Sequence, residues 1–337
     1  MKNILVADNN LENSLEFTNY NFINIFPQKP NDGAYRSTYS ELLYRGKIQS
    51  QLNDELVEVL SPFFENHFSI NKNYSIYLIK PVISALTSIY IDRSIRYLHR
   101  VKNSQKQNFY MLNIPVFNNF SSLDEIKDLS AISWKFNQSV LQTISSYFEN
   151  NNKISISNLK PFEYKNFNLK NLINSPFDLN LKGKILNRIS YSLSNMHSFN
   201  SKFNSLGFSG DEYFFGISGF NGPYGIFQKR IKYKWIIENK NNKLRNIFSE
   251  FLKQNINQNC KNYFTKIFKN FFSNYFTKIL SDNFYNFIVT FYPTNYLETL
   301  IKNFTNAEAL FLKNQINDLI GSSFSRDEGY LMASVAK

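Results

Sequence analysis

The sequence is poor in the residues that build disulfides and local metal motifs. Its single cysteine, Cys260, excludes an internal disulfide and fits a reducing compartment. Its three histidines (His67, His99 and His197) lie far apart, and no Cys/His cluster has zinc spacing, so no local metal motif is expected. The opening MKNILVADNN lacks the apolar core and cleavage site of a signal peptide, which favours a cytoplasmic protein.

The sequence also lacks an apolar run long enough to cross a membrane. The longest run, residues 74–100, is interrupted at Lys80, and its charge-free part, residues 81–91, is far shorter than the ~20 residues that a bilayer requires. A helix from Pro81 to Tyr97 would carry apolar residues on every face. Such a helix lies in the centre of a core. We place Pro81 near its first turn, where a missing N–H costs little.

Aromatic residues and positive charge are abundant instead. Phe (34 residues) and Tyr (21) raise the aromatic share to 17%, and the formal net charge is +12. A basic protein can bind nucleic acid or an anionic membrane. Here the basic residues are spread along the chain among Asn and aromatic residues, so nucleic-acid binding is not the leading interpretation.

Hydrophobic periodicity predicts an α/β protein that is rich in helices. Apolar or alternating runs that end at turn formers or proline predict strands; these cover residues 3–7, 20–26, 108–114, 155–159, 286–292 and 318–323. Three-to-four spacing of apolar residues predicts further helices; these cover residues 37–64, 121–148, 181–199, 262–280 and 296–304. The aromatic stripe of 262–280 favours packing on a core, and a helix lying on a membrane is the alternative.

Residues 207–225 hold six of the eleven glycines of the chain. Such a concentration marks a segment with tight backbone turns. One interpretation is a glycine-rich hairpin or connector, and the other is a loop that presents Asp211 and Glu212 to a substrate. The segment has no G-K-[ST] or GxGxxG pattern, so it is not a phosphate-binding loop.

The C-terminal part is predicted to alternate strand, helix, strand and helix, which is typical of a parallel sheet. Ser325 and Glu328 form a capping-box pattern at the start of the last helix. Ser323 and Ser325 could therefore hold a phosphate at this helix N-terminus, or Ser325 could be a plain helix cap. We divide the chain into an N-terminal domain, 1–284, and the start of a second domain, 285–337.

Several segments together resemble a family of bacterial sugar transferases from surface-polysaccharide (O-antigen-like) gene clusters. The segments that carry the resemblance are Ile4–Ala7, His67, Tyr77–Pro81, Asp92-Arg93, Trp134 with Asn137, Ser322-Ser323 and Glu328–Lys337. The resemblance implies a GT-B-like arrangement of two Rossmann-like domains. Residues 1–284 would be the acceptor-side domain with large helical insertions, and 285–337 the incomplete start of the donor-side domain.

The expected function is therefore that of a glycosyltransferase, or of its N-terminal part. It would move a sugar from a nucleotide donor to a surface-polysaccharide or lipid-linked acceptor, without a cofactor or an obligate metal. Peripheral contact with the inner face of the membrane is compatible with such an acceptor. The alternative is a non-catalytic, basic and aromatic-rich protein that binds a membrane surface or nucleic acid.

The candidate site residues fall into three groups. His67 is the candidate general base, although a hydrogen-bonded structural histidine is the simpler interpretation. Arg93, as a clamp for a pyrophosphate or a sugar carboxylate, competes with a plain Asp92–Arg93 ion pair at the end of the core helix. The remaining candidates are Lys80, Asp211 and Glu212 for substrate, and Ser323, Ser325 and Glu328 for the donor phosphates.

Overall fold

The computed structural model divides the chain into two compact units. The first unit comprises Met1–Phe162 and Asn239–Glu298, and the second comprises Glu163–Glu238 and Thr299–Lys337. The structure describes residues 2–6, 20–25, 37–103, 109–112, 114, 116, 123–149, 156–159, 205–209, 212–216, 229–231, 242–256, 258–292, 296–314, 318–321, 331 and 335.

The first unit contains a parallel sheet of four short strands. They are β1 (Lys2–Val6), β2 (Tyr20–Asn24), β3 (Phe109–Leu112) and β4 (Ile156–Leu159), in the order β2-β1-β3-β4. Leu5 of β1 is fully buried and lies opposite Ile23 of β2 and Met111 of β3. The four N-terminal strands predicted from apolar runs are thus confirmed.

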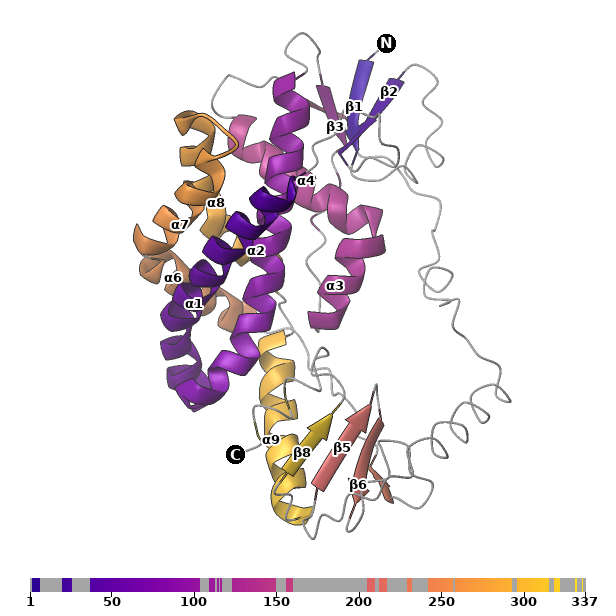
Figure 1. The fold of residues 1–337 in the computed structure, drawn as a ribbon, viewed down its shortest axis with the longest axis vertical. Helices are drawn as coiled ribbons and strands as arrows, with labels where there is room; N and C mark the ends of the chain where they lie inside the picture. The colour runs from indigo at the N-terminus through magenta and orange to yellow at the C-terminus, as the bar shows by residue number, and fades with distance from the viewer. Residues whose placement is uncertain are drawn as a thin grey trace, which may run out of the picture. The chain divides into compact units, whose positions relative to one another are not determined.

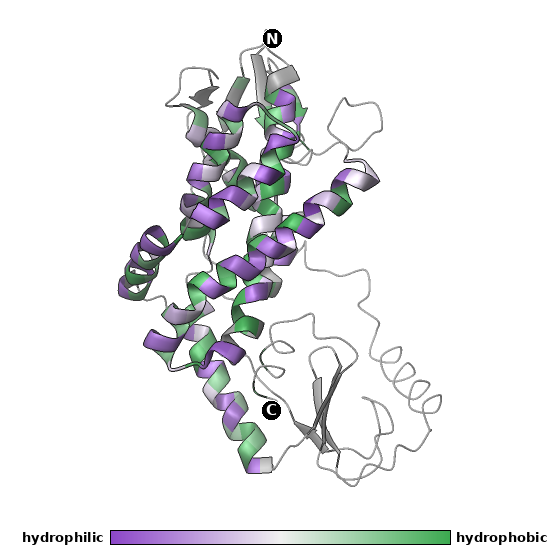
Figure 2. Ribbon diagram, turned by 60° about the vertical axis from the view of Figure 1, so that its left-hand side comes forward, coloured by the Kyte–Doolittle hydropathy of each residue, from purple (hydrophilic) through white to green (hydrophobic). Residues whose placement is uncertain are grey.

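Helices make up most of the first unit (Figure 1). They are α1 (Tyr39–Phe68), α2 (Lys72–Asn103), α3 (Leu123–Ile132), α4 (Trp134–Glu149), α6 (Asn242–Asn255), α7 (Gln258–Lys269) and α8 (Asn274–Phe291). The bands of purple and green along these helices in Figure 2 show that apolar and polar residues alternate along each helix. The chain is therefore helix-rich, as the periodicity predicts.

Helix α2 is the centre of this bundle, and it packs against α1, α3, α4 and α8. Its buried apolar residues cover most of the circumference of the helix, and they are Leu78, Ile79, Val82, Ile83, Leu86, Ile89, Tyr90, Ile91, Ile95, Tyr97, Leu98 and Val101. The prediction of a core helix is confirmed. Pro81, however, lies inside α2 and not in its first turn, because the helix already begins at Lys72.

An aromatic cluster joins α2 to α7 and α8. The Tyr90 ring centroid lies 5.9 Å from that of Phe264 and 5.5 Å from that of Phe284, and Phe264 and Phe284 are themselves 3.8 Å apart. The Tyr90 hydroxyl donates to the carbonyl oxygen of Leu280 at 2.7 Å. The aromatic stripe predicted in 262–280 thus packs on the core.

Three boundaries differ from the sequence-based predictions. The segment 262–280 forms two helices, separated at residues 270–273. The segment 121–148 is interrupted at Ser133, between α3 and α4. The predicted strand 286–292 is wrong, since α8 extends to Phe291 and buries Phe284, Phe287, Ile288 and Phe291 with helical spacing.

The second unit contains a mixed sheet in the order β7-β6-β5-β8. Strands β5 (Ser205–Ser209) and β6 (Glu212–Gly216) are antiparallel, as are β6 and β7 (Lys229–Ile231), while β8 (Asp318–Gly321) is parallel to β5. The antiparallel pair agrees with a hairpin in the first part of the glycine-rich segment, and residues 217–225 lie outside the described residues. The strand predicted at 318–323 and the helix predicted from residue 296, which is α9 (Tyr296–Asn314), are also present.

The division into units differs from the predicted boundary between residues 284 and 285. That boundary falls inside α8, whose buried residues belong to the first unit. The second unit also includes residues 163–238, which the sequence assigned to the N-terminal domain.

Among the described helices, none combines the length and the apolar character that a membrane crossing needs.

Candidate functional site

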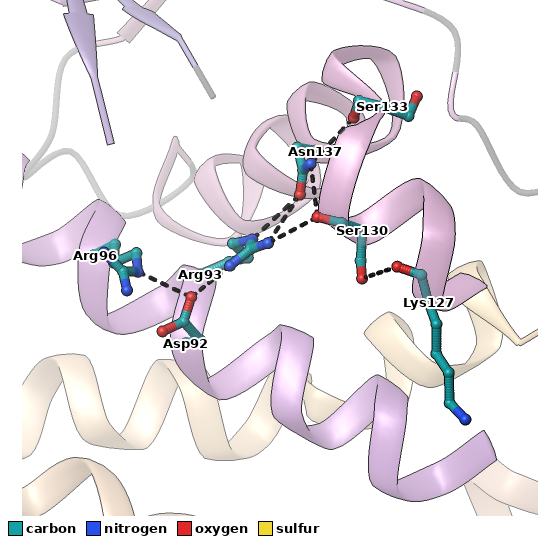
Figure 3. Close-up of polar contacts among 7 residues, drawn as sticks. All are labelled: Asp92, Arg93, Arg96, Lys127, Ser130, Ser133 and Asn137. Atoms are coloured by element: carbon teal, nitrogen blue, oxygen red, sulfur yellow. Dashed lines mark hydrogen bonds and ion pairs between the residues drawn. The ribbon is translucent and has the colours of Figure 1, made fainter. Parts of the chain in front are cut away.

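Asp92 and Arg93 lie in a polar cluster where α2 meets the junction of α3 and α4 (Figure 3). The Arg93 Nη1 donates to the Asp92 carboxylate, and the Arg96 Nε donates to the same oxygen at 2.9 Å. On its other side, the Arg93 guanidinium donates to Asn137 Oδ1 from both Nε, at 3.2 Å, and Nη2, at 3.1 Å. The cluster thus joins two sequence segments that separately carry the resemblance.

The break between α3 and α4 explains why an arginine is held at this place. A helix end leaves backbone carbonyl groups without helical partners. The carbonyl oxygen of Ser130 accepts from Arg93 Nη2 at 3.2 Å and from Asn137 Nδ2 at 3.0 Å, and Asn137 Nδ2 also lies 3.1 Å from the carbonyl oxygen of Ser133. Ser133 directly precedes α4, and its hydroxyl accepts from the backbone N–H of Phe136 at 3.3 Å. Arg93 and Asn137 therefore donate hydrogen bonds to backbone carbonyl groups at the break between the two helices.

The cluster sets one carboxylate, that of Asp92, against the two guanidinium groups of Arg93 and Arg96 in a largely buried place. The side chain of Arg93 is 14% exposed and that of Asp92 25%. Burial lowers the pKa of the Arg93 guanidinium, whereas the neighbouring Asp92 carboxylate raises it. An arginine nevertheless stays protonated in a protein. Asp92 and Arg93 form the predicted ion pair. The pair lies inside α2, which continues to Asn103, and not at the end of the core helix.

A second set of polar contacts lies along the parallel sheet. Arg100 of α2 donates from Nε to the carbonyl oxygen of Asn24, the last residue of β2, at 3.2 Å. The fully buried Gln138 of α4 donates to the carbonyl oxygen of Leu5 at 3.4 Å and to the Met111 Sδ at 3.2 Å. Helix α2 therefore brings an arginine to the carboxyl end of β2, and α4 brings an amide to the pair β1 and β3.

The order of the strands places a change of direction between β1 and its two neighbours, β2 and β3. In the order β2-β1-β3-β4 the chain leaves β1 toward β2 and later returns to its other side as β3. In open parallel sheets, ligands generally bind beyond the carboxyl ends of the strands at such a reversal. Guanidinium groups suit anionic oxygens, since they present several donors in a fixed plane. Of the described arginines, Arg100 contacts this edge of the sheet, through the carbonyl oxygen of Asn24.

Two predicted site residues lie elsewhere in the first unit. Lys80 forms an ion pair with Asp54 of α1, in which Nζ and Oδ1 are 2.5 Å apart and both side chains are about half exposed. His67 is exposed in the last turn of α1, with its ring centroid 4.5 Å from that of Phe63. The helix between Lys72 and Arg93 spans roughly 30 Å at 1.5 Å per residue, so His67 and Arg93 do not belong to one site.

The other predicted site residues are not open to a structural account. Asp211, Ser323, Ser325 and Glu328 lie outside the described residues. Glu212 begins β6, opposite Ser209 of β5, and its side chain is likewise outside the description. Among the predicted site residues, Asp92 and Arg93 are thus the two that contact each other within the described part of the chain.

Sequence reasoning missed Arg96, Arg100 and Gln138. A signal was present, because Asp92, Arg96 and Arg100 recur every four residues along the helix and so share one face. Among the described residues, no three His, Cys, Asp or Glu side chains gather as they would around a metal ion.

No protein-family model, curated protein or solved structure matches this chain.

Proposed function

We propose that the protein is a glycosyltransferase-like enzyme, or the N-terminal part of one. It moves a sugar from a nucleotide donor to a surface-polysaccharide or lipid-linked acceptor. The observation that carries the proposal is the parallel sheet β2-β1-β3-β4, with its reversal between β1 and β3 and with Arg100 at the carboxyl end of β2. Open parallel sheets bind phosphorylated ligands at this edge.

In this proposal the first unit is a Rossmann-like, acceptor-side domain of a GT-B-like enzyme. Arg96 and Arg100 contact the anionic group of the acceptor, such as a lipid phosphate or a sugar carboxylate. Arg93 is a positioning residue, since it holds α2 against the α3–α4 junction. Asp92 keeps Arg96 oriented through its hydrogen bond.

The donor site belongs, in this proposal, to the C-terminal segment that contains Ser323, Ser325 and Glu328. The donor phosphates are neutralised there by the N-terminus of a helix and by basic side chains, so the reaction needs no obligate metal. A base then activates the acceptor hydroxyl. His67 is a poor candidate for that base, because it lies far along the bundle from Arg93.

Calorimetric titration of nucleotide sugars into the full-length protein tests the proposal. At least one of the uridine, guanosine, thymidine and cytidine donors should bind. A Ser323→Ala/Ser325→Ala variant should weaken donor binding, while Arg100→Gln should leave it unchanged, because Arg100 serves the acceptor. If no donor binds to the wild-type protein, the transferase proposal is wrong.

The outer face of α7 favours a second candidate, a basic surface that binds nucleic acid. Lys266 and Lys269 are exposed there, and Lys266 Nζ lies 5.2 Å from the centroid of the Tyr263 ring. Exposed lysines next to aromatic rings suit phosphates and stacked bases. Single-stranded nucleic acid should then bind with a steep salt dependence, which Lys266→Gln/Lys269→Gln should reduce. Donor binding without such affinity would reject this candidate.

A further inference from the structure

The first turns of α1 carry an unusual group of exposed apolar side chains. Tyr39 is 76% exposed, Leu42 44%, Leu43 57% and Tyr44 45%. Apart from these four, the large apolar side chains exposed within the described part of the chain are Val116 and Leu312. The exposed apolar surface of the described residues is therefore concentrated at one end of one helix.

Three of these side chains form a stripe with helical spacing. Tyr39, Leu42 and Leu43 stand at positions i, i+3 and i+4, and Gly46 continues the stripe at i+7. A Cβ atom added to Gly46 would meet no atom within 4 Å, so the surface is open at that position. Val57, five turns after Tyr39, lies on the same face of α1 as Tyr39 and is buried, so the stripe continues the core-facing side of α1 past the end of the core.

Local signals hold this helix end in shape without packing. The Thr38 hydroxyl accepts from the Glu41 N–H at 3.3 Å, and the Glu41 carboxylate accepts from the Thr38 N–H at 2.7 Å. This capping box satisfies donors that a helix start leaves open. The helix thus extends beyond the core, and its apolar stripe is exposed there.

The charges around the stripe favour an anionic partner. Residues 37–50 contain Arg45 and Lys47 and one acidic residue, Glu41, which is occupied in the capping box. The whole chain has a formal net charge of +12. Tyrosines beside leucines, with cations close by, are the composition that lies in the interface of a membrane with anionic lipids.

The size of the stripe argues against a second copy of the chain as the partner. From Tyr39 to Gly46 the stripe is about 11 Å long, which is two helical turns. A stable interface between two proteins buries roughly 800 Å² on each partner, far more than a seam of two turns supplies. A bilayer needs no such area, because two leucines and two tyrosines suffice for a weak peripheral contact when charge attraction assists them.

We propose that the N-terminal end of α1, residues 39–47, is a contact site for membranes that contain anionic lipids. Leu42 and Leu43 enter the boundary between headgroups and acyl chains, Tyr39 and Tyr44 lie at headgroup level, and Lys47 meets lipid phosphates. This inference rests on exposure and charge alone. It stands whether or not the protein proves to be a transferase.

Flotation of the full chain with lipid vesicles tests the inference. The protein should float with phosphatidylcholine vesicles that contain phosphatidylglycerol, and much less with phosphatidylcholine alone. A Leu42→Gln/Leu43→Gln variant should lower the bound fraction roughly tenfold or more. Leu312→Gln removes an even more exposed leucine from α9 and should bind like the wild-type protein.

A second readout keeps the inference testable if the double variant is poorly folded. Leu43→Trp should show a blue shift of its fluorescence when anionic vesicles are added, and Leu312→Trp should not. Equal binding of the Leu42→Gln/Leu43→Gln variant, or no binding of the wild-type protein to any vesicle, would overturn the inference. A concentration-dependent dimer that this variant abolishes would instead identify a second copy as the occupant.

Discussion

Arg93 of α2 directs two donors, Nε and Nη2, at the single Oδ1 atom of Asn137 in α4. The two residues stand 44 positions apart in the chain. Asn137 in turn uses its Nδ2 group to satisfy the carbonyl oxygens of Ser130 and Ser133. One amide therefore couples the core helix to the break between two other helices.

Replacing Arg93 by glutamine should lower the free energy of unfolding by about 2–4 kcal/mol, because hydrogen bonds from a buried charge are lost and Asp92 keeps fewer partners. Urea denaturation measures this loss. Lys80→Gln is the control, since the Lys80–Asp54 pair is exposed and its loss should cost less than about 1 kcal/mol. Equal losses in the two variants would contradict the structural role of Arg93.

A double-mutant cycle of Arg93→Gln and Asn137→Ala should reveal direct coupling. Residues that share a hydrogen-bond network show interaction energies of about 0.5–3 kcal/mol, whereas distant residues add nearly independently. Four unfolding curves, of the wild-type protein, both single variants and the double variant, provide the measurement. Simple additivity would mean that the two side chains stabilise the fold separately.

Two buried tyrosines should respond in opposite ways to the loss of a hydroxyl. The Tyr90 hydroxyl donates to Leu280, so Tyr90→Phe should destabilise the protein by about 1 kcal/mol. The buried Tyr292 hydroxyl has no hydrogen-bond partner among the described residues, so Tyr292→Phe should stabilise it by about 1 kcal/mol. Denaturant midpoints that shift in the same direction would refute this contrast.

Alkaline pH should destabilise the protein through Tyr90 and Tyr292 and through a third tyrosine, Tyr147. Burial raises the pKa of Tyr90, Tyr147 and Tyr292. In the unfolded chain these phenols ionise near pH 10, whereas in the folded chain they keep their protons. The unfolded state thus binds fewer protons above that pH, and stability is lost as the pH rises, by about 1.4 kcal/mol per pH unit for each tyrosine.

Unfolding curves between pH 8 and pH 11 would measure this loss. Stability should be nearly constant up to about pH 9 and fall beyond it. Tyr292→Phe removes one of the three phenols, so its slope should be shallower than that of the wild-type protein. An unchanged slope would show that Tyr292 does not contribute.

The sequence predicted the core better than the ends of its elements. Apolar residues on every face of 81–97 required a central helix, and α2 is that helix. In contrast, Phe287, Ile288 and Phe291 were read as a strand, because a short apolar run before a proline has no clear period of its own. Their helical spacing becomes visible only when α8 is followed from Asn274.

The break between α3 and α4 illustrates a limit of local patterns. Ser133 is neither glycine nor proline, and the apolar spacing continues through it. The Ser133 hydroxyl caps α4 by accepting from the Phe136 N–H, which is a local signal. The donation from Arg93 to the freed Ser130 carbonyl oxygen is a long-range contact that no local pattern contains. For the same reason the sequence indicated that Asp92 and Arg93 would pair, but not that Asn137 would join them.

The candidate site was predictable in part. Lys80 and His67 were selected by residue type and by the resemblance, and neither property fixes where a side chain lies in three dimensions. Arg100 was overlooked because its role depends on the end of β2, which lies 76 residues earlier in the chain.

The most direct test of the proposed function is calorimetric titration of nucleotide sugars into the full-length protein. We predict that at least one donor binds with a dissociation constant below about 1 mM, the upper end of typical Michaelis constants. The matching nucleoside diphosphate should compete with it. Absence of binding by uridine, guanosine, thymidine and cytidine donors alike would contradict the account.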